Sequence, residues 1–124
     1  MFMLKIKRIY DHDQDYQSYR ILVDRMWPRG ISKDNAKLND WTKEIAPSVE
    51  LRKWFAHDPE KFADFQIEYQ KELDLNPYTK QFIATVKKQL AHGDVTLLYG
   101  AKDTKNNQAV VLKHYLEQKL GKTD

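Results

Sequence analysis

The sequence contains no cysteine and only four glycines and four prolines among its 124 residues. The missing cysteine excludes disulfides, thiolate nucleophiles, thiolate zinc sites and iron–sulfur ligation. No apolar run approaches the roughly 20 residues that a membrane-spanning helix requires, so we expect no membrane partner. A lysine already stands at position 5, too early for a signal peptide, and we therefore expect a cytoplasmic protein.

Neither sign of charge is in large excess. The chain carries 21 Lys and Arg against 18 Asp and Glu, and the two signs are interspersed along much of its length. A dedicated nucleic-acid-binding protein usually has a clustered basic face, so nucleic acid is weakly supported as a partner. Apolar residues make up 41%, which together with the length predicts one globular domain over residues 1–124.

Short apolar segments alternate with helical patterns along the chain. Strands are expected over 4–10, 20–27 and 94–100, and the run Ile21-Leu22-Val23 is typical of a strand covered on both faces. Helices are expected over 48–56, from the cap residue Asp58 through 73, from Asn76 to a stop at Gly93, and over 106–120. Helices between apolar strands favour an α/β fold with a mostly parallel sheet flanked by helices.

The link between the first two expected strands is less regular. Its nine residues, 11–19, are mostly polar and too few for a helical crossover. We therefore expect the first strand to run antiparallel to the second or to lie apart from it. Three strands leave sheet edges that need cover from helices or from a second chain, which a homodimer would supply.

Polar and aromatic side chains follow the second and third expected strands, where ligands bind in parallel α/β sheets. The predicted ligand-binding residues are Asp24, Arg25, Trp27, Arg29, Gly30, Tyr99, Lys102, Asp103 and Asn107. The guanidinium forks of Arg25 and Arg29 suit bidentate contact with phosphate or carboxylate. The site therefore predicts a compact anionic ligand, such as a phosphate- or carboxylate-bearing metabolite or nucleotide.

A purely structural role fits the same residues. Asp24 and Arg25 would then pair with neighbours to close a strand end, Trp27 would be a core residue, and 28–30 would be only a turn. A nucleic-acid or protein interaction module is a further alternative.

An enzyme, either a transferase or a hydrolase acting on such a ligand, is another alternative. Its catalytic candidates are His57, Asp24 and Asp103, with His57 the best titrating group. Motifs for a serine nucleophile, a phosphate-binding loop and a dinucleotide-binding loop are absent. No cofactor bound through a glycine-rich loop is therefore expected.

Two other histidine positions and one aromatic cluster favour structural roles. The loop Asp11-His12-Asp13 offers oxygen and imidazole ligands, but nothing else stands at metal-ligand spacing, so we expect a solvated loop and no metal. His114 and Trp54 are expected on the inward faces of their helices. Phe62, Phe65 and Tyr69 recur at core spacing rather than as a base-stacking platform.

Three blocks of the sequence resemble the small bacterial YeaO-like family, a domain of unknown function. They are RILVDRMWPRG, APSVELRKWFAHDPEKFADFQIEYQKEL and VTLLYGAKDTKNNQAVVLKHYL, and the resemblance extends from about residue 6 to residue 120. Longer relatives have a helix between the first two strands and Rossmann-like domains. The resemblance therefore implies a small Rossmann-like or flavodoxin-like parallel sheet.

The family's signature covers three groups of residues in this chain. They are Asp24, Arg25, Trp27, Pro28, Arg29 and Gly30; His57, Asp58 and Pro59; and Lys102, Asp103 and Asn107. Family members often show Asn-His-Ala where this chain has Asn107-Gln108-Ala109. If that histidine is a catalytic acid or base, this chain lacks it. A binding role would survive the change, because glutamine keeps a donor and an acceptor.

Overall fold

A four-stranded parallel sheet forms the centre of the computed structural model, which describes residues 2–121. The strands are β1 (Leu4–Arg8), β2 (Tyr19–Leu22), β3 (Asp40–Trp41) and β4 (Val95–Tyr99). Their order across the sheet is β1-β4-β2-β3, and every neighbouring pair is parallel. The predicted α/β class with a parallel sheet is confirmed.

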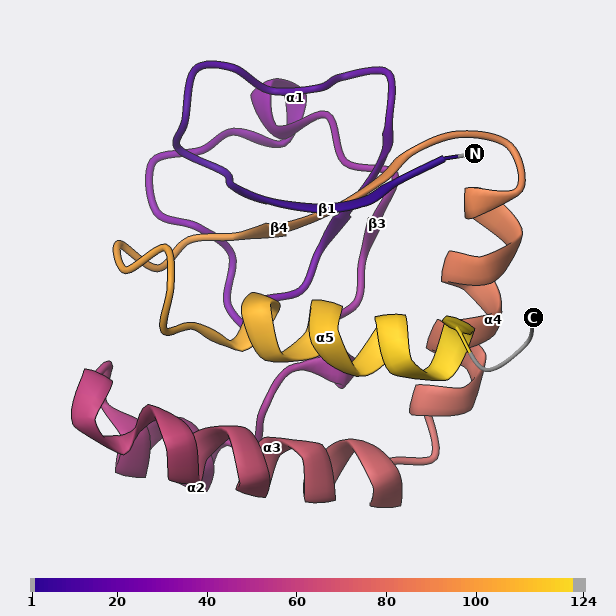
Figure 1. The fold of residues 1–124 in the computed structure, drawn as a ribbon. Helices are drawn as coiled ribbons and strands as arrows, with labels where there is room; N and C mark the ends of the chain where they lie inside the picture. Colours follow the sequence, from indigo (N-terminus) through magenta and orange to yellow (C-terminus); the bar gives the residue numbers. More distant parts are fainter. Residues whose placement is uncertain (1, 122–124) are drawn as a thin grey trace.

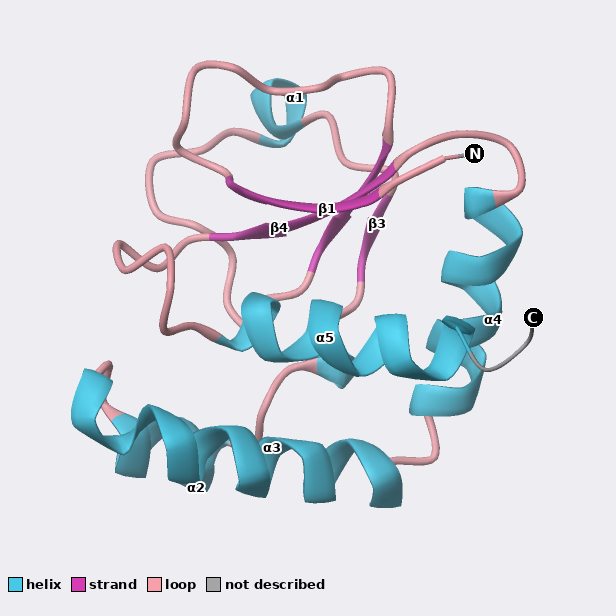
Figure 2. Cartoon of the chain, viewed as in Figure 1, coloured by secondary structure: helices cyan, strands magenta, loops and turns pink. Residues whose placement is uncertain are grey.

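Of the two alternatives for the first strand, separation from the second strand is confirmed. β1 runs parallel to its neighbour β4, which lies between β1 and β2. The link between β1 and β2 therefore crosses one strand, and it does so as a loop rather than a helix (Figure 2). The sequence also gave no sign of β3, because two residues are too short to display strand alternation.

The predicted helices are present with shifted ends. They are α2 (Val49–Phe55), α3 (Phe62–Leu75), α4 (Thr79–Leu90) and α5 (Gln108–Gly121). A short α1 (Lys33–Ala36) and two 3₁₀ turns, η1 (Lys43–Ile45) and η2 (Pro59–Lys61), were not predicted. The cap prediction for Asp58 is confirmed, since its carboxylate accepts a hydrogen bond from the Glu60 amide at 3.0 Å.

The two faces of the sheet are covered differently (Figure 1). Helices α2 to α5 pack on one face, around a core that includes Ile21, Val23 and Leu97. Loops and the short α1 cover the other face, around a smaller core that includes Leu22 and Leu98. Residues 21–23 are fully buried, so the predicted cover on both faces is confirmed, although the longer helices flank only one of them and the other has only the four-residue α1.

On the loop-covered face of the sheet, a buried arginine connects two segments of the chain through hydrogen bonds. Arg20 is 1% exposed, and its guanidinium donates to Gln14 Oε1 at 2.9 Å and to the carbonyls of Ala36 and Lys37 at 2.9 and 3.2 Å. It also lies 4.7 Å from the centre of the Tyr16 ring. Arg20 thereby ties the β1–β2 loop to the end of α1.

Two side chains predicted to point inward are exposed. The buried stripe of α5 includes Val111, Leu112, Tyr115 and Leu116, and His114 falls on the opposite side of the helix because successive residues turn by about 100°. Trp54 is 43% exposed, whereas its neighbour Phe55 and the residue Leu51 are buried. Among residues 2–121, no helix combines the length and apolar character needed to cross a bilayer.

Candidate functional site

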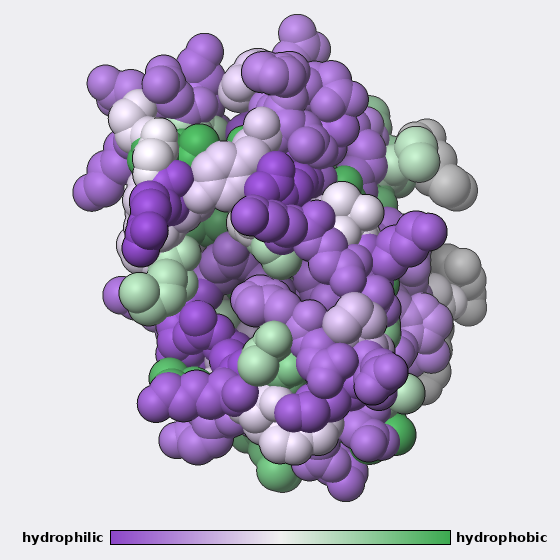
Figure 3. All heavy atoms as spheres, turned by 90° about the vertical axis from the view of Figure 1, so that its left-hand side faces the viewer, coloured by the Kyte–Doolittle hydropathy of each residue, from purple (hydrophilic) through white to green (hydrophobic). Residues whose placement is uncertain are grey.

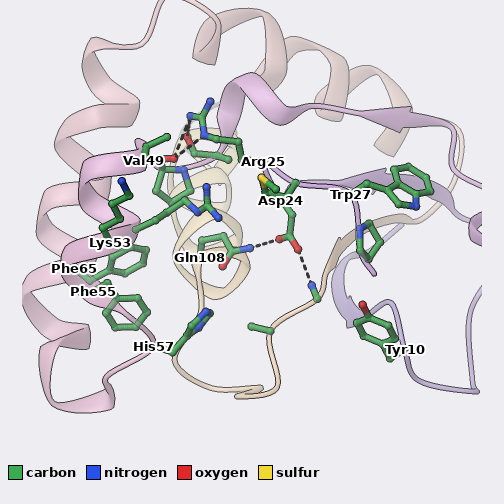
Figure 4. Close-up of a pocket in the computed structure, with 17 residues that line it drawn as sticks. Tyr10, Asp24, Arg25, Trp27, Val49, Lys53, Phe55, His57, Phe65 and Gln108 are labelled. Atoms are coloured by element: carbon green, nitrogen blue, oxygen red, sulfur yellow. Dashed lines mark hydrogen bonds between the residues drawn. The ribbon is translucent and has the colours of Figure 1, made fainter. Parts of the chain in front are cut away.

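The carboxyl ends of β2 and β4 meet at one edge of the sheet because the two strands are parallel neighbours. The segment after β2, the segment after β4, the first residue of α5 and the helix α2 surround a cavity of about 440 Å³. The juxtaposition predicted for the two strand ends is therefore present. Figure 4 shows its lining side chains.

Asp24 connects three elements at the floor of this cavity. One of its carboxylate oxygens accepts a hydrogen bond from the Gly100 amide at 2.8 Å, and the other accepts one from the Gln108 side-chain amide. A Cβ atom at position 100 would lie 3.2 Å from Asp24 Oδ2. Glycine at this position therefore permits the close approach of the backbone to the carboxylate.

Burial dominates the ionisation of Asp24. Removal from water raises the pKa of its carboxyl to about 6, although the Gly100 amide, the positive charges of Arg52 and His57, and the Gln108 amide all act to lower it. The carboxylate forms no ion pair with any residue between 2 and 121. Asp24 is thus a partly buried acid whose charge is balanced only by hydrogen bonds and by more distant cations.

Arg25 lines the cavity but turns away from Asp24 (Figure 4). Its guanidinium donates to the Pro47 carbonyl at 3.1 and 3.3 Å and to the Ala46 carbonyl at 3.3 Å. These contacts hold the segment that leads into α2 against the end of β2. Within the described residues Arg25 is in no ion pair.

Trp27 forms an aromatic wall of the cavity on the side opposite α2 (Figure 4). Its indole N–H donates to the Ile31 carbonyl at 2.6 Å, and its ring packs edge-on against Trp41 with centroids 5.4 Å apart. Tyr10 lies beside it and donates its hydroxyl to the Arg29 carbonyl at 2.8 Å. Both rings are therefore fixed in place by the loop-covered face.

Several predicted site residues lie outside the cavity lining, namely Arg29, Gly30, Tyr99, Lys102, Asp103 and Asn107. The chain turns after Pro28, and Gly30 adopts a φ of 81° in that turn, so the side chain of Arg29 is exposed. Tyr99 is buried in the core at 3% exposure.

The other three residues form the entry to α5. Lys102 is exposed. Asp103 accepts hydrogen bonds from the amides of Lys105 and Asn106 at 2.8 and 2.9 Å. Asn107 accepts one from the Val110 amide at 3.1 Å and donates to the Asp103 carbonyl at 2.8 Å. This network shapes the turn before α5 and sets the position from which Gln108 reaches Asp24.

The sequence interpretation missed two cations of the cavity, Arg52 and Lys53 of α2. Both are exposed residues of α2, and nothing in their local pattern indicates that α2 packs beside the strand ends. His57, a predicted candidate, does line the cavity. Ala56 and His57 have φ values of 49° and 58°, so two successive left-handed residues end α2 and turn the chain there.

The loop after β1 contains no assembled metal site. Lys7 lies 2.7 Å from Asp13 and 3.9 Å from Asp11, so both carboxylates face a cation of the protein. In the part of the chain that the structure describes, no group of three or more His, Cys, Asp or Glu side chains is placed to hold a metal ion.

The family model of the inactive DUF488-N3 subclade matches residues 3–124. The chain belongs to this family. It is 42% identical to the uncharacterised protein YeaO of Escherichia coli (strain K12) over 113 residues, which cover 91% of this chain and 96% of that protein. It is 34% identical to an uncharacterised protein of Mycobacterium tuberculosis (strain ATCC 25618 / H37Rv) over 113 residues, 91% of this chain and 92% of the relative. The resemblance to YeaO-like proteins is confirmed.

No solved structure matches the chain significantly. Gln108 donates its side-chain amide to Asp24 and so supplies a neutral hydrogen-bond donor to this partly buried acid.

Proposed function

We propose that this protein binds a compact anionic ligand in the cavity at the carboxyl ends of β2 and β4. The observation that carries the proposal is the set of basic side chains around the cavity: Arg25, Arg52 and Lys53, together with His57. None of these four is in an ion pair with another residue among 2–121. The positive charge of the two arginines and the lysine is therefore available to a phosphate or carboxylate group, and His57 adds a ring N–H donor.

Some cations outside the cavity are already engaged within the protein. Lys5, Lys7, Lys71 and Lys113 are in ion pairs with carboxylates, whereas Arg20 is buried beneath a loop. Figure 3 views the molecule from the side at which β4 ends, and this face is mostly hydrophilic with only small separate hydrophobic patches. A small polar ligand fits such a surface better than a broad apolar partner.

The sequence predicted that Arg29 and Lys102 contact the anionic ligand. In this proposal Arg52 and Lys53 make that contact instead. Arg25 keeps a part in it, because its guanidinium fixes the residues before α2 and lines the cavity at the same time. Anion recognition by guanidinium is favoured where its donors are held in a fixed orientation.

Binding without turnover is the form of this function that we favour. The description of the family as an inactive subclade supports it. The enzymatic alternative rests on Asp24, whose pKa of about 6 is suited to proton transfer near neutral pH. Turnover of a bound phosphate ester that is lost in Asp24→Asn would favour that alternative.

Thermal unfolding in the presence of inorganic phosphate, sulfate and nucleotides tests the proposal, with chloride used to keep the ionic strength constant. A ligand at about 100 times its Kd adds about 2.7 kcal/mol of stability, which raises the Tm of a domain of this size by about 10 °C. We expect the shift in the wild type and in Arg29→Ala, and its loss in the double variant Arg52→Ala, Lys53→Ala.

Arg29→Ala is the matched control, because it removes an exposed cation close to the cavity but outside its lining. Equal shifts in all three proteins would contradict binding in the cavity. Binding to short DNA or RNA that weakens steeply with salt, without any effect of phosphate, would favour a nucleic-acid-binding module instead.

A further inference from the structure

The Asp24 carboxylate has hydrogen-bonding capacity that the protein does not use. An ionised carboxylate can accept about four hydrogen bonds, and Asp24 accepts two, from Gly100 and Gln108. It is in no ion pair within the described part of the chain. A carboxylate removed from water is costly unless it is paired, and this one is partly buried and lines the cavity.

The cations of the cavity do not supply the missing partner. Arg25 directs its guanidinium to backbone carbonyls. Arg52 and His57 act on Asp24 only through their charge, without a hydrogen bond to it. The cavity lining therefore contains an acceptor, Asp24, which Figure 4 shows beside Gln108, together with basic side chains from α2 and the segment after it.

We propose that the ligand is amphoteric: an N–H donor, preferably a protonated amine, binds the Asp24 carboxylate, while an anionic group binds on the Arg52 and Lys53 side. This inference rests on the proposed function, because it specifies what the anionic ligand carries at its other end. A ligand with an anionic group alone would leave Asp24 without an ion-pair partner and with its remaining acceptor capacity unused. The structure thus favours amino acids, amino phosphates and related zwitterions over simple phosphate esters or carboxylates.

The test compares two probes that differ only in the amine, 2-aminoethyl phosphate and ethyl phosphate, by isothermal titration calorimetry at neutral pH. A charge-assisted hydrogen bond to Asp24 gives the amine probe an affinity about tenfold or more above that of ethyl phosphate. In Asp24→Asn the two affinities are expected to become equal, while binding of ethyl phosphate persists. The comparison within the wild-type protein does not depend on the folding of any variant.

The possible results separate this inference from the function on which it rests. Equal affinities of the two probes for the wild type would overturn the amphoteric ligand and leave anion binding in place. A preference for the amine that persists in Asp24→Asn would overturn the assignment to Asp24. Failure of ethyl phosphate, 2-aminoethyl phosphate and inorganic phosphate to bind at millimolar concentrations would overturn both proposals.

Discussion

Asp24 and Gly100 lie 76 residues apart in the sequence, and a hydrogen bond of 2.8 Å from the Gly100 amide to the Asp24 carboxylate joins them. The bond fixes the chain leaving β2 to the chain leaving β4. It also places a carboxylate on the floor of the cavity, where burial raises its pKa to about 6.

We expect Gly100→Ala to disturb this contact. The added Cβ would lie 3.2 Å from Asp24 Oδ2 and 3.6 Å from a ring carbon of Tyr10, so the carboxylate or the backbone must shift. The expected loss is about 1 kcal/mol in the free energy of unfolding, measured by urea denaturation. Gly93→Ala is the matched control, because a Cβ at position 93 meets nothing within 4 Å. Equal effects of the two substitutions would contradict the close packing at Gly100.

The raised pKa of Asp24 predicts a particular pH dependence of stability. The folded state holds the proton more tightly than the unfolded state, in which the pKa is 3.8. The stability of the wild type relative to Asp24→Asn is therefore greatest below about pH 4, falls by up to about 3 kcal/mol as the pH rises to about 6, and stays constant above it. Urea denaturation of both proteins across this range measures the difference.

Asp103 provides a control of opposite sign. Hydrogen bonds from the Asn106 side chain and from the amides of Asn106 and Lys105 lower the pKa of its carboxyl below 3.8. The wild type should therefore lose stability relative to Asp103→Asn as the pH falls below the ordinary range of aspartate. The same slope for both variants would show that the pH dependence does not arise from Asp24.

Arg20→Met is expected to destabilise the loop-covered face of the sheet. Methionine retains much of the apolar stem but leaves the carbonyls of Ala36 and Lys37 without the donors that Arg20 supplies. Unpaired buried acceptors cost about 1–3 kcal/mol, so we expect a loss of about 2 kcal/mol and faster limited proteolysis between residues 9 and 18. Unchanged stability and proteolysis would show that the loop is held independently of Arg20.

Phe65→Ala is expected to cost about 3–5 kcal/mol as a core truncation. Phe65 is 1% exposed and its ring stacks on Phe55 with centroids 4.2 Å apart. Ile67→Ala on the same helix removes a side chain that is 52% exposed, and we expect it to change stability by less than about 0.5 kcal/mol. If Phe65→Ala and Ile67→Ala have the same denaturation midpoint, this packing of Phe65 is contradicted.

Much of the secondary structure was predictable because local signals were strong. Fully buried strands appear as short apolar runs, as at 21–23 and 95–99, and the spacing of Phe65, Tyr69 and Leu73 marks the buried face of α3. The cap at Asp58 depends only on residues next to it in the sequence. Neither β3 nor α1 has the length that gives a pattern.

The candidate site was predictable only in part. Asp24, Arg25 and Trp27 follow directly from β2, so the rule that ligands bind at strand ends identified them. Arg29 follows just as closely, but a turn carries its side chain out of the cavity. Arg52 and Lys53 reach the cavity because α2 packs beside the strand ends, a contact between segments with no local signature.

The sequence by itself determined the α/β class, the four longer helices and the buried strands β2 and β4, because these depend on hydrophobic spacing and on caps formed by neighbouring residues. Only the tertiary structure decided that β4 lies between β1 and β2, and that Asp24 shares one cavity with Gly100, Gln108 and the cations of α2. The physical reason is that strand order and site composition arise from contacts between segments far apart in the chain, whose energies no local pattern encodes.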